Sequence, residues 1–495
     1  MVLFVLFFNQ LSIAQNDADA LRYSMINWGS TARSLGMGNS FSALGADPSV
    51  MATNPGGLGF YRRSEFTFSP TFTGRSTTGE ILNNEVKKNN LKFNFSNLAF
   101  VWAFPKDDDK NELQRWSFGI GYNRLNDFNS KSFTEGTNSR NSLLDTYLKQ
   151  IDDDNTSPSN FGDQYPFDIN LAWQTFLIDT VSDSTGLYIY SAIPAGGARQ
   201  RRTVETKGGM GEWDFSFGTN YRDKVYFGAT LGLVSVSYKE NITWEETDVN
   251  NTIASEDLLH NIKSYKYTTN LNTDGSGFNL KFGIIYRPND VLRLGAAIHT
   301  PTFLTLTDNY KSSITSNFEG GASYTQASPD FLPFDYNINT PFRAIGSIGL
   351  VLGKNGIIGA EYEYLNYSSS DISPKDKQFE SSFVDANNTI KRRYAASHNF
   401  RLGGELRYEA LRFRVGGSYY GTPFSNGYND KETDQSRVCV NGGIGVREKN
   451  FYFDASYGYT ISGSYEGVYS FENENIGVKQ TTINNRVMVT LGFNY

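Results

Sequence analysis

The chain has 495 residues, of which 45 are Lys or Arg and 52 are Asp or Glu, so its net charge is −7. This balance excludes the basic surface that nucleic-acid binding requires, and we expect no nucleic acid among its partners. Its 37 Phe, 30 Tyr and 47 Gly beside only 14 Pro favour an all-β protein, and the mean hydropathy of −0.44 suits a barrel whose strands turn alternate side chains toward lipid.

The N-terminal residues are typical of an export signal. Val2–Phe8 is apolar, and Ser-Ile-Ala at 12–14 resembles the small residues of a cleavage site. We therefore expect residues 1–14 to be a signal peptide, with a buried N-terminal strand as the alternative, because no Lys or Arg precedes Arg22. No later stretch approaches the roughly 18 apolar residues of a membrane helix, so strands must make any membrane crossing.

The next segment, Gly29–Phe60, carries seven glycines and lacks the alternation of a strand. Small residues let backbone segments pack closely and adopt turns that larger side chains forbid. This composition predicts a compact plug, and we expect residues 15–63 to form a hatch inside a barrel built from residues 64–495.

From residue 64 onward, apolar or aromatic side chains recur at every second position. In the last segment the odd positions from Ile483 to Tyr495 are mostly apolar, whereas the even ones include Asn484 and Arg486. One face of each strand would thus meet lipid and the other water. The alternation predicts a transmembrane antiparallel β-barrel of about 14 strands. The expected strands lie near 64–73, 91–104, 115–125, 211–221, 224–239, 275–287, 291–307, 341–352, 356–367, 397–408, 411–420, 437–447, 450–460 and 483–495.

The expected connections alternate between brief turns and long polar stretches. The long stretches lie near 74–90, 126–210, 240–274, 308–340, 368–396, 421–436 and 461–482. Outer-membrane barrels have short periplasmic turns and long external loops, so we expect both termini on the periplasmic side. A soluble sandwich or propeller is the alternative, but no internal repeat of about 40 to 50 residues is present, and soluble sheets rarely expose so many aromatic side chains.

Within 126–210, five apolar residues recur at helical spacing, which predicts a short amphipathic helix. They are Leu143, Leu144, Tyr147, Leu148 and Ile151.

Charged residues of the later strands are expected to face the lumen, because residues two apart on a strand share one face. We interpret them as a mixed-charge network that wets the barrel wall and holds the hatch, not as catalytic groups. The set comprises Glu361, Glu363, Arg401, Glu405, Arg407, Arg412 and Arg414.

Other kinds of chemistry find little support. The single cysteine, Cys439, cannot close a disulfide within the chain, and no His or Cys spacing is typical of a metal site, so we expect no metal. Phe41 stands where the third glycine of a dinucleotide loop begun by Gly36 and Gly38 would lie, and we expect no cofactor. An enzyme in the barrel wall is a weak alternative, because the histidines lack a Ser or Cys partner motif. These histidines are His260, His299 and His398.

Glycine-rich stretches of the expected hatch carry a family resemblance. They read Ala-Arg-Ser-Leu-Gly-Met-Gly at 32–38, Phe-Ser-Ala-Leu-Gly at 41–45 and Asn-Pro-Gly-Gly-Leu at 54–58. The chain resembles the FadL/TodX family of outer-membrane transporters over nearly its whole length. The resemblance implies a 14-stranded barrel with an N-terminal hatch in the lumen, and uptake of long-chain fatty acids or aromatic hydrocarbons.

The resemblance also implies residue roles. Helical elements in the family's external loops help form a landing groove, so the apolar residues at 143–151 are a candidate groove, although a helix that only packs its loop onto the rim is an equal explanation. A kinked strand that opens the wall sideways is known in the family, and Gly119 and Gly121 would permit one; glycines facing a crowded lumen explain them equally well. Gly56 departs from the Ala more usual in the family. The implied hatch or gate residues are Arg33, Gly36, Gly38, Asn54, Pro55, Gly56 and Gly57.

We expect passive uptake of hydrophobic small molecules, such as long-chain fatty acids, across the cell outer membrane, without enzymatic activity. The expected partners are a hydrophobic ligand, outer-membrane lipid and, through the C-terminal Tyr495, the barrel-assembly machinery. Removal of apolar area from water would drive the ligand into the protein. The alternative is a non-transport barrel that serves as an anchor or shuttle for exported proteins in a secretion apparatus.

Overall fold

The computed structural model describes residues 17–105, 113–183, 186–191, 197–249, 262–426, 434–472 and 474–495. The expected signal peptide at 1–14 lies outside these residues, as does His260. No helix in the described part of the chain is long and apolar enough to cross a membrane.

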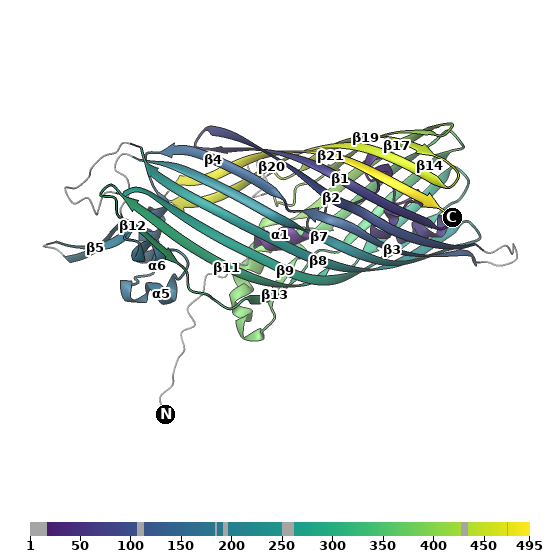
Figure 1. Cartoon of the computed structure of the whole chain (residues 1–495). Helices are drawn as coiled ribbons and strands as arrows, with labels where there is room; N and C mark the ends of the chain where they lie inside the picture. The colour runs from purple at the N-terminus through teal and green to yellow at the C-terminus, as the bar shows by residue number, and fades with distance from the viewer. Residues whose placement is uncertain are drawn as a thin grey trace, which may run out of the picture.

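One large antiparallel sheet dominates the structure, and Figure 1 shows it as a barrel of tilted strands. A separate hairpin pairs β5 (Ile178–Asp183) with β6 (Gly186–Ser191). In the described chain the large sheet contains the segments β1 (Glu65–Ile81), β2 (Asn84–Pro105), β3 (Leu113–Asp127), β4 (Ser130–Asn138), β7 (Ala198–Tyr221), β8 (Val225–Asp248), β9 (Ile262–Tyr286), β10 (Leu292–His299), β11 (Phe303–Phe318), β12 (Ser323–Ala327), β13 (Phe334–Asn339), β14 (Arg343–Leu352), β15 (Gly356–Asn366), β16 (Asp371–Pro374), β17 (Ala396–Tyr408), β18 (Leu411–Tyr420), β19 (Arg437–Arg447), β20 (Phe451–Phe471) and β21 (Glu474–Asn494).

The sheet closes because its first strand pairs with its last. β1 runs antiparallel to β21, from Glu65 opposite Asn494 to Glu80 opposite Lys479. Four pairs of segments, β3 with β4, β10 with β11, β13 with β14 and β15 with β16, each continue one strand of the barrel, and β12 is a short addition to β11. The predicted closed barrel of 14 antiparallel strands is therefore confirmed.

The outer surface carries the apolar face that the alternation predicted. Phe278 and Phe282 on β9 are 48% and 46% exposed, whereas Asn279 and Lys281 beside them are 5% and 2% exposed and face the lumen. A closed sheet pairs backbone N–H and C=O groups between neighbouring strands, which lipid could not do. This surface therefore suits a hydrocarbon environment.

Several strands run farther than the alternation indicated. β1 and β2 continue through 74–90 to a tight turn at Leu82 and Asn83, both with positive φ, where a polar loop was expected. β8 and β9 likewise extend into 240–274, and β20 and β21 into 461–482. The expected loops at these places were wrong in extent, because the outward side chains of these strand ends are mostly polar and only a few inward ones, such as Trp244 and Val478, are apolar.

One expected strand, 291–307, is divided in the structure. β10 ends at His299 and β11 begins at Phe303, with Pro301 between them. Proline has no N–H to donate to the ladder, and Pro341 lies in the matching gap between β13 and β14. Thr302 N donates to Thr340 Oγ1 at 2.8 Å, so a side chain takes over where the ladder stops.

The N-terminal residues lie inside the barrel, where α2 contacts β18 to β21 and η1 contacts β3, β7, β8 and β9. We call residues 17–63 the inner segment. The remaining helices lie in the long connections. In chain order the described helices are α1 (Asp17–Ser24), α2 (Ala32–Gly36), α3 (Val50–Thr53), η1 (Pro55–Phe60), α4 (Leu143–Asp153), η2 (Pro158–Asn160), α5 (Phe161–Gln164), α6 (Ile169–Gln174), η4 (Tyr367–Ser369), η5 (Lys377–Phe383) and α7 (Val384–Arg393).

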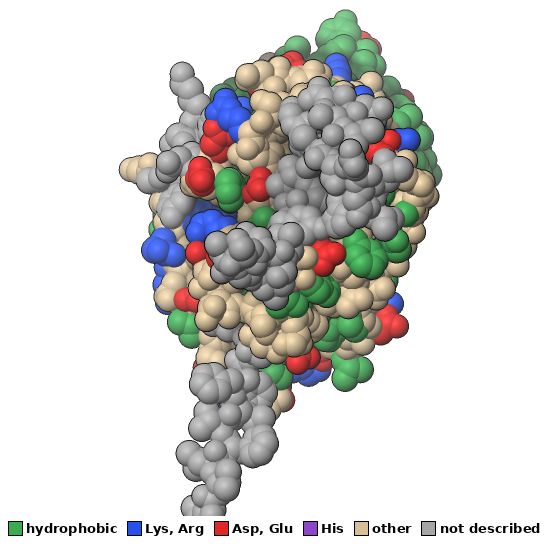
Figure 2. Space-filling view, turned by 90° about the vertical axis from the view of Figure 1, so that its left-hand side faces the viewer, with side chains coloured by type: hydrophobic (Ala, Val, Ile, Leu, Met, Phe, Trp, Pro, Cys, Tyr) green, Lys and Arg blue, Asp and Glu red, His purple; other side chains and the backbone are tan. Residues whose placement is uncertain are grey.

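The two ends of the barrel differ. The C-terminus lies at one end, and α5, α6, β5 and β12 lie at the other, which we call the turn end and the loop end (Figure 1). The surface of the loop end mixes acidic, basic and hydrophobic side chains (Figure 2).

The lipid-facing surface predicts a dependence on depth along a single strand. Leu402, midway along β17, and Tyr408, at its turn-end tip, are 59% and 64% exposed on the outer face. Leu402→Arg should lower the free energy of unfolding in phospholipid vesicles by about 2–4 kcal/mol, and Tyr408→Arg by about 0–1 kcal/mol, because a charge near the interface reaches water. Denaturant titration of both variants measures this; equal, small effects would contradict the placement of this face in hydrocarbon.

Candidate functional site

Side chains fill the lumen at three successive levels along the barrel, and strand β8 contributes a residue to each level. Trp244, near the loop end of this strand, belongs to the layer that we call the mouth cluster. Val236, farther down, belongs to a second cluster, the chamber. Gly228, nearer the turn end, packs against Pro55 of the inner segment.

The chamber is lined by apolar and aromatic side chains from β3 round to β16 and from the connections beyond β16. A lumen that only passed water and ions would be polar, so this lining is the first sign of a hydrophobic occupant. The wall and loop residues of the chamber are Leu125, Phe128, Met210, Val234, Val236, Tyr238, Leu271, Leu304, Leu306, Tyr336, Ile338, Leu365, Tyr367, Ile372, Phe383, Ile390, Tyr394 and Phe424.

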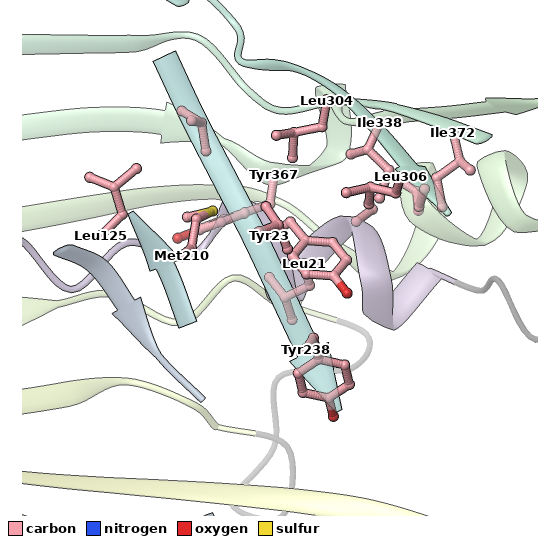
Figure 3. Close-up of a cluster of buried hydrophobic side chains, with 14 of the residues drawn as sticks. Leu21, Tyr23, Leu125, Met210, Tyr238, Leu304, Leu306, Ile338, Tyr367 and Ile372 are labelled. Carbon is pink, nitrogen blue, oxygen red and sulfur yellow. The ribbon is translucent and has the colours of Figure 1, made fainter. Parts of the chain in front are cut away.

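Helix α1 fills the chamber, and Figure 3 shows its residues Leu21 and Tyr23 among the wall side chains. The Tyr23 ring meets Phe128 and Tyr238 edge-on, with centroids 6.0 Å and 6.5 Å apart. The Arg22 guanidinium lies 4.3 Å from the centroid of the Tyr238 ring. An apolar ligand could therefore occupy the chamber only where α1 yields space.

Polar contacts hold both ends of α1. At its start, Asp17 Oδ2 accepts hydrogen bonds from Arg393 Nη1 at 3.0 Å and from Tyr394 OH at 2.7 Å. At its end, Arg343 of β14 donates to the carbonyl of Ser24. The helix is thus tied to α7 on one side and to the barrel wall on the other.

Below the chamber, the Asn-Pro-Gly-Gly stretch packs against β9 with almost no space. Asn54 Oδ1 accepts from Gly56 N at 3.1 Å, and Asn54 Nδ2 donates to the Ile284 carbonyl at 3.3 Å. A Cβ on Gly56 would lie 3.0 Å from the Gly283 carbonyl oxygen. The glycine that departs from the family pattern is therefore explained by its closeness to the wall.

The other glycines expected in the hatch also lie at close contacts. Gly38 has a φ of +65°, and a Cβ there would lie 2.8 Å from the backbone of Gly417. A Cβ on Gly36 would approach Arg414 Cβ to 3.3 Å, and one on Gly57 would approach Val50 to 2.8 Å. Close backbone packing, rather than flexibility, is what these positions require.

Arg33 of α2 enters a buried ion cluster centred on Glu405. Arg33 Nε donates to Glu405 at 3.0 Å, and Arg414 Nε and Arg407 Nε donate to the same carboxylate at 2.8 Å and 3.0 Å. Burial lowers the pKa of Arg33, but the carboxylates of Glu405, Asp47 and Asp454 together raise this pKa above its usual value. Arg414 also lies 2.7 Å from Asp454. The ion pairs of this cluster connect the inner segment to β17, β18 and β20.

A second cluster joins the remaining predicted lumen residues. Arg401 pairs with both Glu361 and Glu363, and Arg343 Nη1 donates to Glu363 at 2.7 Å. Glu361 Oε2 accepts from the backbone N of Ser42 in the inner segment at 3.2 Å. Six of the seven predicted lumen residues thus lie in these two clusters.

Arg412 is the seventh, and the structure places it apart. Its guanidinium donates to the carbonyls of Glu409 and Leu411 at 2.6 Å and 2.7 Å, at the turn end of β18. The alternation puts Arg412 on the inward side, but its position beside the turn keeps it from the carboxylates.

A third cluster was not among the predicted residues. Lys281 Nζ lies 2.8 Å from Asp214 and also contacts Glu212, and all three are buried. His299, at the end of β10, lies 2.8 Å through Nε2 from the Thr53 carbonyl of the inner segment. The side-chain alternation of β7 and β9 places these charged residues on the inward face. The signal that could have identified them was therefore present in the sequence.

The predicted loop helix is present as α4. Ser142 and Asp145 form a capping box at its start, and Ser142 Oγ donates to Glu246 at 2.6 Å. Leu144, Tyr147 and Ile151 are buried in the mouth cluster, and Leu143 and Leu148 are partly buried against it. The same cluster includes side chains of β8, β9, β11, β20 and β21 at the loop end. The residues of the mouth cluster are Ile81, Leu144, Tyr147, Ile151, Phe161, Ile169, Leu171, Ala172, Leu177, Ile178, Trp244, Ile262, Tyr265, Ile314, Phe318, Tyr469, Ile476 and Val478.

An exposed apolar surface lies beside α6 and β12. Leu332 is 92% exposed, and the rings of Phe331 and Phe167 contact each other at a tilt, with centroids 4.9 Å apart. Phe176 and Tyr324 lie 4.7 Å apart and are also exposed. We call these five residues the loop patch.

The wall itself changes between β2 and β3. Their ladder ends at Asn97 opposite Asn123, and β4, which continues β3, pairs with β7. Gly119 and Gly121 lie within the paired part, and a Cβ on either would collide with Met51 of the inner segment, at 2.5 Å and 2.6 Å. These glycines therefore make room for the inner segment, and they do not mark the place where the ladder stops.

A closed 14-stranded barrel whose lumen is filled by its own N-terminal chain defines the structural class. The Pseudomonas putida toluene transporter TodX aligns with a TM-score of 0.53 and 13% identity, over 94% of this chain and 98% of its own. A Pseudomonas aeruginosa FadL homologue aligns with a TM-score of 0.55 and 13% identity, over 95% and 99%. The chain has the FadL/TodX-type transporter fold. No protein-family model and no curated protein matches the sequence.

Removal of the central carboxylate should release the inner segment. Glu405→Gln leaves Arg33, Arg407 and Arg414 without their shared anion, and breaking such a buried cluster costs about 3–5 kcal/mol of unfolding free energy. Glu409→Gln, in the exposed turn beside it, is the matched control and should cost almost nothing. Denaturant unfolding of both variants provides the test, and equal stability of the two would show that the cluster does not hold the inner segment.

Proposed function

We propose that the protein is an outer-membrane channel for the passive uptake of hydrophobic small molecules. The observation that carries this proposal is the apolar chamber, which lies inside a barrel whose outer face suits lipid. The similar fold of TodX, a toluene transporter, supports a hydrophobic ligand. The proposal includes no enzymatic activity and no cofactor.

The location follows from the same features. Barrels of this form reside in the bacterial outer membrane, where their short turns face the periplasm and their loops face outward. We place the turn end, with Tyr495, at the periplasm and the loop end outside. The terminal aromatic residue would then engage the barrel-assembly machinery.

The path begins, in this proposal, at the loop patch and the neighbouring α4. An apolar ligand that leaves water for exposed Leu332 and Phe331 gains roughly 25 cal/mol for each Å² removed from water. Leu148, only partly buried on α4, lies at the edge of the mouth cluster beneath it. The ligand would pass from this surface through the mouth cluster to the chamber.

The inner segment acts as the hatch of this path. Its helix α1 occupies the chamber and its glycine-rich part closes the lumen below, so release of the ligand requires the segment to shift. The place where the β2–β3 ladder ends, at Asn97 and Asn123, offers a sideways way out of the wall. In the absence of a nucleotide motif in the sequence, we propose that the ligand moves downhill or is drawn inward by its consumption inside the cell.

If the chamber is the path of the ligand, the side chain at position 306 must be apolar. Leu306 is fully buried in the chamber lining. Leu306→Asp should lower the initial rate of uptake of radiolabelled oleate or toluene by about tenfold or more, because a carboxylate in an apolar site costs several kcal/mol. Leu306→Met keeps the volume and the apolar surface, and it should retain the wild-type rate. The amount of folded barrel in the membrane is measured in parallel.

Wild-type uptake by a correctly assembled Leu306→Asp variant would contradict the chamber as the path. Normal lipid and toluene uptake in a deletion strain, together with a large copurifying partner, would instead support an anchor or shuttle for exported proteins.

Substitutions on the external apolar surface should weaken the initial binding of the ligand and leave its passage through the barrel unchanged. Leu332→Asp and Leu148→Asp should each raise the ligand concentration for half-maximal uptake several-fold while the maximal rate stays unchanged, since the landing surface loses apolar area. Asn355→Asp adds the same charge to an exposed turn at the opposite end and serves as the control. A full-rate, full-affinity Leu148→Asp variant would remove α4 from the mechanism, and the same result for Leu332→Asp would remove the loop patch.

A further inference from the structure

A cavity of about 230 Å³ lies in the lumen, on the side opposite the apolar lining of the chamber. It separates the inner segment, at Asn27 and Trp28, from the wall formed by β18 to β21 and β1. Hydroxyl and amide side chains such as Thr460 and Asn484 supply most of that wall. The cavity is therefore polar and is distinct from the chamber.

Three arginines face this cavity: Arg75 from β1, Arg437 from β19 and Arg486 from β21. None has a carboxylate within ion-pair distance among the residues that the structure describes. Every charged cluster described above pairs each cation with an acid, so this cavity breaks the pattern of the lumen. Three positive charges that face one small, partly open cavity repel one another unless an anion joins them.

The contacts of the arginines are to neutral groups only. Arg75 donates through Nε to Asn484 Oδ1 at 2.8 Å and through Nη1 to the Asn129 carbonyl at 2.7 Å. Arg437 donates to Asn27 and lies 4.7 Å from the centroid of the Tyr420 ring, and its buried Nε has no partner. Arg486 has no hydrogen-bond or ion-pair partner within the described chain.

Asp127 is the one acid of the described residues that line the cavity, Arg75 Nη2 donates to its backbone carbonyl at 3.2 Å, and its carboxylate accepts hydrogen bonds from two asparagines. Its Oδ2 accepts from Asn94 Nδ2 at 2.6 Å, and its Oδ1 accepts from Asn129 N at 3.0 Å. Oδ1 also lies 3.9 Å from Arg124 Nη2. The lining therefore keeps a positive excess of two charges.

We propose that this cavity, which we call the arginine cavity, binds an oxyanion, either a carboxylate or a phosphate group. Guanidinium groups present planar pairs of N–H donors that match the oxygens of such anions. The hydroxyls and amides of the wall can satisfy the oxygens that the arginines leave free. A hydrocarbon would leave these donors unpaired, so the occupant differs in chemistry from that of the chamber.

This proposal stands apart from hydrophobic uptake. The arginine cavity could hold a small free anion in a protein that transports nothing, and the chamber could pass hydrocarbons with the cavity empty. Direct binding measurements test the cavity, whereas uptake measurements test the chamber, so that failure of one leaves the other standing.

The single cysteine of the chain provides a probe inside the cavity. Cys439 lines it, and Thr460 Oγ1 donates to Cys439 Sγ at 3.2 Å. In the purified full-length barrel, sodium phosphate or sodium acetate should slow the reaction of Cys439 with a small neutral thiol reagent. Sodium chloride at the same ionic strength should slow the reaction much less, because a spherical ion cannot bridge two guanidinium groups in the same way.

Variants separate binding from general charge effects. Arg486→Gln should weaken the protection by phosphate about tenfold, since it removes one charge-assisted contact. Arg140→Gln, which changes the same charge at a side chain 73% exposed at the loop end, should leave protection unchanged. Calorimetric titration with phosphate and acetate gives the same comparison without the cysteine, and it decides the matter if Cys439 does not react.

Octanoate identifies the source of the oxyanion. If octanoate binds far more tightly than acetate while octanol does not compete, the cavity receives the head of an acidic amphiphile; if octanoate and acetate bind equally, it receives a small free ion. Either result supports the proposal. The absence of calorimetric binding by phosphate, acetate and octanoate, or unchanged binding in Arg486→Gln, would overturn it.

Discussion

The structure depends on one constraint, which is that a strand in hydrocarbon must find hydrogen-bond partners for its whole backbone within the protein. The pairing of β1 with β21 goes far to meet it, because it joins the first strand to the last and closes the sheet into a ring. Closure then fixes the chemistry of both faces. The outer face can be apolar at every alternate position, and the inner face is freed to carry charges and hydroxyls that water or the inner segment must satisfy.

A closed ring of this size leaves a lumen that wall side chains cannot fill, and the inner segment fills it by contact of backbone with backbone. Gly38 against Gly417 and Gly56 against Gly283 show how small residues on both partners bring the chains together. The buried ion clusters define the position of the inner segment along the barrel wall. Since a buried pair often contributes little net stability, the clusters around Glu405 and Arg401 serve chiefly to fix where the inner segment sits on the wall. A segment that is held by a few buried ion pairs can be released when those pairs break together. Extensive apolar packing offers no such small set of contacts.

The sequence predicted what local periodicity encodes. The side-chain alternation revealed the barrel, its strand number and the inward direction of residues such as Glu363 and Arg401. It could not reveal partners, because Arg33 and Glu405 are brought together only by the closure of the sheet. It also missed the extensions of β1 and β2, where polar residues predominate and the alternation of apolar and polar side chains is weak. Gly119 and Gly121 show a further limit, since the sequence permitted a kink or a crowded lumen, and only the position of Met51 distinguishes the two.

At the level of the chamber, the lumen has an apolar side and a cationic side, and Trp28 lies between them. On one side it belongs to the apolar chamber, and on the other it lines the arginine cavity. Trp28 follows α1 in the chain by only four residues, and Asn27, its neighbour, accepts a hydrogen bond from Arg437. A withdrawal of α1 from the chamber would therefore pull on the residues that wall off the cavity. The two compartments thus share one short stretch of the inner segment, and a ligand that reached both surfaces at once would gain contacts in each.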